Sequence, residues 1–153
     1  MFNAVMSNAD NFDILISTAA IADYKPKDYS KSKYKKNEND ITIKFTRGAD
    51  IISAASKKNN NIYTVGFAAE TEALEKNAQA KLIKKNLDMI VGNIANHELK
   101  LGFESDFNEV IIFTRDKTQK IAKAKKSDIA ASILQAVSVE YSLKIKVVNN
   151  DVR

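Results

Sequence analysis

Lys81 and Lys85 lie four residues apart in an alanine-rich segment that is typical of a helix, so their side chains are expected on one helix face. The preceding residues 65–70, VGFAAE, are predicted to form a buried strand that carries Gly66 and Phe67. Glycine lets a ligand approach the backbone, an aromatic ring can stack on a planar base, and two ammonium groups can bind phosphates. In the alternative interpretation the lysines are solvated residues favoured by the helix dipole, and Phe67 belongs to the core.

A second group of candidate residues accompanies the apolar segment 13–22, DILISTAAIA, which is predicted to be a strand. Ala19 and Ala20 leave room for a ligand against the backbone, and Asp23 places a carboxylate directly after the segment. Ligands of open α/β sheets bind beyond the carboxyl ends of the strands. Asp23 is therefore a candidate to order a metal ion or to accept a hydrogen bond from a sugar or a base. The alternative is that Asp23 serves only the proline-containing turn that follows.

Residues 31–36, KSKYKK, form a lysine-rich run without hydrophobic periodicity. Such a run is usually a solvated loop, but it also fits a flap that closes over a polyanion, neutralises its charge and excludes water. His97 is the only histidine and cysteine is absent, so a metal cage has no support and we expect His97 in an exposed loop. The four glycines form neither a G-x-G-x-x-G nor a Walker-type phosphate loop.

The bulk properties limit the classes of function. A chain of 153 residues with 44% hydrophobic and 28% charged residues is expected to fold as one domain. The net charge of +5 and the pI near 9.3 favour anionic partners, for which a phosphorylated small molecule suffices. A nucleic-acid binder is disfavoured because only Tyr34 interleaves an aromatic with the basic run. The absence of cysteine, of a secretory-type start and of a long apolar stretch leads us to expect a cytoplasmic protein without a membrane span.

The remaining pattern predicts a three-layer α/β fold with a mainly parallel sheet and a C-terminal β-hairpin. Helices are predicted at 2–9, 51–58, 72–85 and 127–141, and strands at 13–22, 40–46, 62–69, 87–94, 109–115 and 119–124. Asp50 is expected to cap the second helix and Thr71 the third. Residues 23–39 are expected to be a mobile loop, and the tail 142–153 an edge strand or a loose end.

Five segments carry a resemblance to a known family. They are AAIADYKPK at 19–27, KYKK at 33–36, VGFAAET at 65–71, AKLIKKNLDMIVGN at 80–93 and GFESDFNEV at 102–110. In this order and near this spacing they resemble the phosphopantothenoylcysteine synthetases of coenzyme A biosynthesis, which are often fused behind a flavin-dependent decarboxylase. The resemblance covers about residues 13–142.

This resemblance implies a Rossmann-like fold and a ligase that works in two steps. The carboxylate of 4′-phosphopantothenate attacks the α-phosphate of CTP, which Mg²⁺ accompanies, and gives an acyl-cytidylate and pyrophosphate. The amine of cysteine then displaces CMP and forms the amide. The resemblance also implies a homodimer and a separate flavin-dependent decarboxylase as a partner.

The resemblance assigns roles to individual residues. Lys33 matches the family's flap lysine and is implied as the catalytic residue that assists formation or retention of the acyl-cytidylate. The implied nucleotide-binding residues are Ser17, Thr18, Ala19, Asp23, Lys33, Gly48, Ala49, Asp50, Ile51, Phe67, Lys81 and Lys85, with Phe67 beside the cytosine. Residues 47–50 read RGAD where the family commonly has Lys-Asn-Pro-Asp, so only Asp50 is identical. Asn93 is implied in substrate binding, although the family's following aspartate is absent here, and no metal ligand is assigned.

Family members carry a strand, a glycine-containing loop and an asparagine ahead of the position that matches Met1. We therefore expect residues 1–153 to be a single synthetase-like domain without the N-terminal βα unit. Two functions remain open at this point. One is a CTP-dependent ligase, and the other is a non-catalytic nucleotide-binding module that needs a second chain for turnover.

Overall fold

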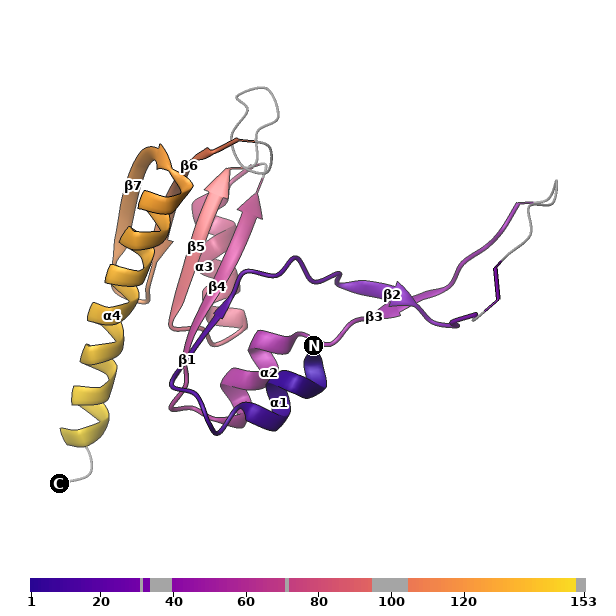
Figure 1. The fold of residues 1–153 in the computed structure, drawn as a ribbon, viewed down its shortest axis with the longest axis horizontal. Coiled ribbons are helices and arrows are strands. Elements are labelled where there is room, and N and C mark those ends of the chain that lie inside the picture. Colours follow the sequence, from indigo (N-terminus) through magenta and orange to yellow (C-terminus); the bar gives the residue numbers. More distant parts are fainter. Residues whose placement is uncertain (31, 34–39, 71, 95–104, 151–153) are drawn as a thin grey trace.

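A mixed five-stranded sheet with the strand order β1-β4-β5-β6-β7 organises the protein (Figure 1). The computed structural model describes residues 1–30, 32–33, 40–70, 72–94 and 105–150. The strands are β1 (Ile14–Ser17), β4 (Tyr63–Glu70), β5 (Met89–Ile94), β6 (Phe107–Phe113) and β7 (Thr118–Lys125). The first three run parallel, and the last two add an antiparallel hairpin at one edge. The predicted parallel strands and C-terminal hairpin are confirmed.

Helices cover both faces of this sheet (Figure 1). Because successive side chains of a strand point to opposite faces, β4 and β5 supply two separate cores. Val65 belongs to the core that α4 (Lys126–Asn150) covers, and Ile90 belongs to the core that α2 (Ile51–Lys58) and α3 (Leu74–Lys84) cover. The predicted three-layer α/β fold is therefore confirmed.

A side chain caps the start of α2, whereas the residue before α3 makes no capping hydrogen bond with its side chain. The predicted first helix is α1 (Phe2–Asn8), which lies beside α2. Asp50 caps α2 as predicted, because its Oδ1 accepts a hydrogen bond of 3.2 Å from the backbone N–H of Ser53. The third helix begins two residues later than predicted, after Ala73, whose φ of 48° lies in the left-handed region. The predicted cap Thr71 lies outside the described residues.

The prediction of an unstructured loop at 23–39 is wrong in its first part. β2 (Tyr24–Pro26) pairs antiparallel with β3 (Phe45–Arg47) and forms a two-stranded ribbon that extends away from the sheet (Figure 1). Every residue of the ribbon is exposed, so alternation of buried and exposed side chains gave no signal for β2. The half-exposed strand predicted at 40–46 is reduced to β3 at 45–47, and its residues are fully exposed rather than half-exposed. Residues 31 and 34–39 lie outside the described residues.

The first strand is also shorter than predicted. β1 ends at Ser17, and the residues from 18 to 22 continue without regular structure toward the ribbon. The last pair in the register joins Ser17 to Gly66, although β4 continues to Glu70. The alanines after Ser17 therefore line the carboxyl end of the sheet, where β1 has ended but β4 continues.

Residues 142–150 of the tail predicted as an edge strand or a loose end are instead helical, because α4 continues to Asn150, and the rest of the tail lies outside the described residues. Two contacts hold this extension against the sheet. The Tyr141 ring lies edge-on to Tyr63 with 6.1 Å between the ring centroids, and Lys144 Nζ lies 2.9 Å from Asp88 Oδ1. Over the described ranges, no helix combines the length and the apolar character that a membrane crossing needs.

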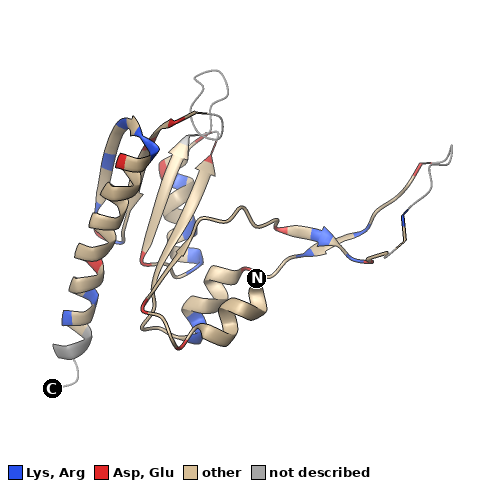
Figure 2. Ribbon diagram, in the orientation of Figure 1, with Lys and Arg blue, Asp and Glu red and all other residues tan. Residues whose placement is uncertain are grey.

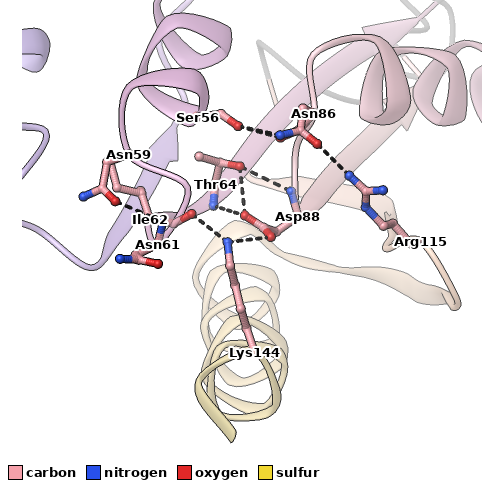
Figure 3. A network of polar contacts seen from close by, with 9 residues as sticks. All are labelled: Ser56, Asn59, Asn61, Ile62, Thr64, Asn86, Asp88, Arg115 and Lys144. Atoms are coloured by element: carbon pink, nitrogen blue, oxygen red, sulfur yellow. Dashed lines mark hydrogen bonds and ion pairs between the residues drawn. The ribbon is translucent and has the colours of Figure 1, made fainter. Parts of the chain in front are cut away.

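A polar network at the amino ends of β4 and β5 joins these elements (Figure 3). Asp88 Oδ2 accepts hydrogen bonds from the backbone N–H and the hydroxyl of Thr64, and Lys144 bridges Asp88 Oδ1 and the Ile62 carbonyl oxygen. Burial raises the pKa of Tyr63 above its ordinary value, and the negative charges of Asp88 and Glu140 raise this pKa further. The network lies at the end of the sheet opposite to the candidate site, and its role is to fix the strands and α4.

Candidate functional site

A cavity of about 250 Å³ lies at the carboxyl ends of β1 and β4, on the face of the sheet that α2 and α3 cover. We call it the first cavity. Its lining residues are Ser17, Ala19, Ala20, Ile21, Ala22, Asp23, Gly48, Ala49, Asp50, Ile51, Ile52, Gly66, Phe67, Lys81, Lys85, Leu87 and Ile90. They come from the end of β1 and the segment after it, the approach to α2 and its first turn, the middle of β4, the end of α3, and β5 with the segment before it. The position agrees with the rule that open α/β sheets bind ligands beyond their carboxyl ends.

Most of the residues assigned by resemblance lie around this one cavity. Those that line it are Ser17, Ala19, Asp23, Gly48, Ala49, Asp50, Ile51, Phe67, Lys81 and Lys85. Thr18 and Asn93 line a second cavity instead, and Lys33 lines neither. The structure thus brings together segments that are far apart in the sequence, while the roles of the individual residues stay predictions.

Lys81 is held by a carboxylate that the sequence analysis did not single out. Its Nζ lies 2.6 Å from Glu70 Oε1, and Glu70 Oε2 accepts a hydrogen bond of 3.1 Å from Asn77 Nδ2. The Glu70 side chain is only 15% exposed, whereas that of Lys81 is 45% exposed. An ammonium group has three donors, so Lys81 can keep Glu70 and still offer donors to an anion in the cavity. Glu70 therefore orients Lys81.

Lys85 is held in a similar way by the residue that caps α2. Its Nζ lies 2.9 Å from Asp50 Oδ2, while Asp50 Oδ1 accepts the hydrogen bond from Ser53. One carboxylate thus fixes the start of α2 and the end of α3 on the same side of the cavity. The two cavity lysines are therefore paired before any ligand arrives, and an anion has to share them with carboxylates.

One wall of the first cavity depends on a close backbone contact at Gly48. The Gly48 N–H donates a hydrogen bond of 2.7 Å to the Asp23 carbonyl oxygen. A Cβ atom at Gly48 would lie 2.8 Å from the Ala22 carbonyl oxygen, which is too close for a real side chain. Glycine is therefore required here for the approach to α2 to lie against the segment that follows β1.

The second cavity has a volume of about 340 Å³ and lies on the α4 face of the sheet. Its lining residues are Thr18, Ala19, Ala20, Phe67, Ala69, Asn93, Asn108 and Lys126. It shares Ala19, Ala20 and Phe67 with the first cavity, so the two cavities meet over the ends of β1 and β4. A third and larger cavity, about 660 Å³, lies between α4 and the hairpin and contains none of the residues assigned from the sequence.

Lys33 lines neither cavity in this structure, and the flap over a ligand stays a prediction. It is exposed and follows β2 along the ribbon, which extends away from the sheet (Figure 1). The ribbon has no buried residue to anchor it to the domain, which accounts for its direction. The catalytic role of Lys33 therefore stays a prediction.

Basic and acidic side chains around the cavities limit the kind of ligand that can bind there. Lys and Arg residues are spread over α3, α4, the hairpin and the ribbon (Figure 2). Within the described ranges, no group of three His, Cys, Asp or Glu side chains could hold a metal ion. The first cavity contains the carboxylates of Asp23 and Asp50. One or two carboxylates are enough for a cation that is bound mainly by the phosphate oxygens of a nucleotide and by water. His97 lies outside the described residues.

Comparison with known proteins places the chain in a family. The family model for the DNA/pantothenate metabolism flavoprotein C-terminal domain matches residues 1–140. The chain belongs to this family. A coenzyme A biosynthesis bifunctional protein CoaBC from Vibrio parahaemolyticus is 41% identical over 138 residues, which are 88% of this chain and 34% of that protein. The chain spans about a third of the length of the curated relatives that it matches.

Solved structures agree with this membership. A crystal structure of the C-terminal domain of a CoaBC protein superposes with a TM-score of 0.70 at 29% identity and covers 94% of this chain and 61% of that chain. A structure of the Cab2 mutant H337A in complex with phosphopantothenate-cysteine superposes with a TM-score of 0.71 at 13% identity, over 95% of this chain and 51% of that chain. At that identity the second likeness shows the fold alone.

Sequence reasoning missed several residues that shape the site. Glu70 ends β4 and lies eleven residues before Lys81, and only the turn from β4 into α3 brings the two side chains together. Asn108 and Lys126 were missed because the hairpin, whose position in the sheet the sequence did not give, places them beside Asn93. Only Glu70 had a signal in the sequence, because it is an acidic residue at the end of a buried strand, where ligand sites of α/β sheets lie.

Proposed function

We propose that this chain is a CTP-dependent ligase domain that joins 4′-phosphopantothenate to cysteine in coenzyme A biosynthesis. The observation that carries the proposal is the first cavity, which gathers Asp23, Phe67, Lys81 and Lys85 from separate segments at the carboxyl end of the sheet. Membership of the family and the CoaBC relatives support the same reaction.

The reaction has two balanced steps. A carboxylate oxygen of 4′-phosphopantothenate forms a bond to the α-phosphorus of CTP, the bond from that phosphorus to the bridging oxygen breaks, and pyrophosphate leaves. The amine nitrogen of cysteine then attacks the acyl carbon, the bond to CMP breaks, and the amine loses a proton. The protein's main tasks are to position the reactants and to neutralise the phosphates.

Each cavity residue then has a physical task. Lys81 and Lys85 offer donors to the phosphates, and Glu70 and Asp50 hold these lysines in place. Phe67 is 41% exposed and presents its ring to the cavity as a stacking surface for the base.

The small residues and the backbone complete the nucleotide cavity. Ser17 and Ala19 leave the end of β1 accessible, while Gly48, Ala49 and Ile51 bring backbone against the nucleotide. Thr18 lies beside them on the other face of the sheet. Lys33 is proposed to act after the ribbon that carries it approaches the cavities, when it would stabilise charge on the acyl-cytidylate.

Mg²⁺ is proposed as part of the substrate, bound to the triphosphate, with Asp23 as the nearest candidate for an outer contact. A cation of this kind usually keeps several waters and needs only one or two carboxylates besides phosphate oxygens. We also propose a homodimer, a separate flavin-dependent decarboxylase as partner, and a cytoplasmic location.

The experiment that tests the proposal measures pyrophosphate release. The chain is mixed with MgCTP and 4′-phosphopantothenate, first without cysteine and then with it. Release that requires both substrates, followed by amide formation when cysteine is added, is the expected result. Binding of MgCTP without any pyrophosphate would instead favour the nucleotide-binding module that needs a second chain. Equal release with ATP would overturn the preference for CTP.

A further inference from the structure

The strand β7 ends the five-stranded sheet, and among the described residues it pairs with β6 alone (Figure 1). Its other side is therefore a free backbone edge. An edge strand presents alternate N–H and C=O groups outward, and another extended segment can bind them. β7 has eight residues, Thr118–Lys125, which is more than the usual strand length of about five or six. The edge is long enough to pair with a peptide.

The third cavity, of about 660 Å³, lies directly against this edge. Residues 117–121 line it without a gap. Within this run, Ile121 packs toward the core that α4 covers. Lys120 points to the other face of the sheet, because its partner Ile111 packs against the other core. Since residues of both kinds line the cavity, it reaches the edge of the strand. A segment paired with β7 would place alternate side chains in the third cavity.

The lining of the third cavity is apolar in its depth. Met89 and Ile112 are buried there, and Val139 of α4 adds an exposed apolar side chain. Glu140 also lines the cavity, but its Oε1 lies 3.0 Å from Lys117 Nζ, so its charge is already paired. Aliphatic side chains of a bound segment fit this lining, because they leave water without separating an ion pair.

The strand beside the cavity is basic. Lys120, Lys123 and Lys125 are exposed, and β7 contains no Asp or Glu. Lys120 Nζ lies 2.8 Å from Glu109 Oε1, whereas Lys123 and Lys125 have no ion-pair partner among the described residues. Opposite charges on neighbouring strands attract each other. An acidic segment therefore complements the charge of this edge.

The same lysines decide between two possible occupants of the edge. Pairing of β7 with β7 of a second copy would set the lysines of both copies on one face. Like charges on paired strands are destabilising, and lysine on an edge strand commonly prevents such self-pairing. The net charge of +5 adds to the repulsion between copies. An acidic segment of another protein meets no such repulsion.

We propose that the outer edge of β7 binds an extended segment of a partner protein in which apolar side chains alternate with Asp or Glu. The backbone of the segment pairs with β7, its apolar side chains enter the third cavity, and its carboxylates lie along Lys120, Lys123 and Lys125. The inference goes beyond the ligase proposal, because none of the residues assigned from the sequence lines the third cavity.

The test measures binding of synthetic peptides to the full chain by fluorescence anisotropy. The probe is Glu-Val-Glu-Val-Glu-Val-Glu, which alternates acidic and apolar side chains. The order Glu-Glu-Glu-Glu-Val-Val-Val keeps the charge and removes the alternation. Methylation of all backbone nitrogens removes the donors, and Lys-Val-Lys-Val-Lys-Val-Lys reverses the charge. Amide hydrogen exchange, with and without the probe, reports where the peptide binds.

Two pairs of variants test the edge and the cavity separately. Lys123→Glu reverses a charge on β7, and Lys84→Glu reverses one at an exposed position of α3. Val139→Glu places a carboxylate in the lining of the third cavity, and Val147→Glu does so at an exposed position of α4 that does not line it. Val139 is 53% exposed and Val147 is 59% exposed, so both positions tolerate the change. Urea unfolding checks each fold.

The expected result is that the alternating acidic probe binds and slows amide exchange in β7. The three control peptides bind at least about tenfold more weakly. Lys123→Glu and Val139→Glu each raise the Kd for the probe about fivefold or more, whereas Lys84→Glu and Val147→Glu change it by less than about twofold. Higher salt weakens binding of the probe, since carboxylates and lysines attract each other.

Several results would overturn the inference without touching the ligase proposal. Equal binding of the block-ordered peptide would mean that charge alone attracts it. Slower exchange outside β7, with none in β7, would place the site elsewhere. If the probe does not bind, the lysines of β7 serve only to keep the edge unpaired. If β7 amides of the free chain exchange more slowly as its concentration rises, a second copy covers the edge and the choice of partner is wrong.

Discussion

The nucleotide proposal makes its sharpest prediction at Lys81, whose replacement by Met keeps most of the aliphatic stem and removes the charge. Two unit charges 4 Å apart interact by about 1 kcal/mol in water and about 4 kcal/mol near a protein surface. The Lys81 side chain is 45% exposed, so the low end of this range applies. A loss of about 1.5 kcal/mol is consistent with one hydrogen bond to a charged group and corresponds to about a tenfold rise in the Kd for MgCTP.

Lys84 provides the matched control for this prediction. It lies in the same last turn of α3, is exposed, and lines neither cavity. Lys84→Met therefore removes the same charge from the same end of the helix dipole, and we expect a change in Kd of less than about twofold. Calorimetry with MgCTP at two salt concentrations measures both variants. Equal losses in both would mean that only long-range charge matters, and an unchanged Lys81→Met would refute the phosphate contact.

Three further predictions concern the walls and the frame of the site. Gly48→Ala places a Cβ against backbone that cannot yield, so we expect it to cost about 1 to 3 kcal/mol in urea unfolding and to weaken MgCTP binding. The pKa of Tyr63 is higher in the folded state than its ordinary value of about 10. The protonated Tyr63 side chain therefore stabilises the fold fully below about pH 10, and this stabilisation is lost by about 1.4 kcal/mol for each pH unit above that value. Tyr63→Phe should lack this loss in pH-dependent unfolding. Lys144→Met should lower the free energy of unfolding by about 2 kcal/mol because it removes the ion-pair partner of the Asp88 carboxylate, whereas the exposed Lys146→Met should change it by less than about 0.5 kcal/mol.

The parts of the fold that the sequence predicts are those in which local chemistry and burial agree. Asp50 precedes an apolar helical pattern, and it caps α2 as expected. The nearly continuous apolar run of β5 indicates a strand covered on both faces, and β5 is such a strand. The ribbon escapes prediction because its pairing depends on two exposed segments about twenty residues apart, so no burial pattern marks β2.

The sequence predicted which segments line the candidate site but not how their side chains pair. Asp23 and Phe67, which the sequence predicted near the ends of apolar strands, both line the first cavity, which lies toward the carboxyl edge of the parallel strands. The pairing of Lys81 with Glu70 was not predictable, since it depends on the path of the chain between β4 and α3. The assembly of Asn108 and Lys126 in the second cavity depends on the position of the hairpin in the sheet, which the pattern of single strands does not specify.

MgCTP is proposed to bind where β1 ends beside β4. Backbone amide NMR of the labelled chain during titration with MgCTP tests this claim most directly. We expect shift changes confined to residues 17–23, 48–51, 66–67 and 81–85, with β7 unaffected. Shift changes centred on the large cavity between β7 and α4, or spread along the basic surface without saturation, would contradict it.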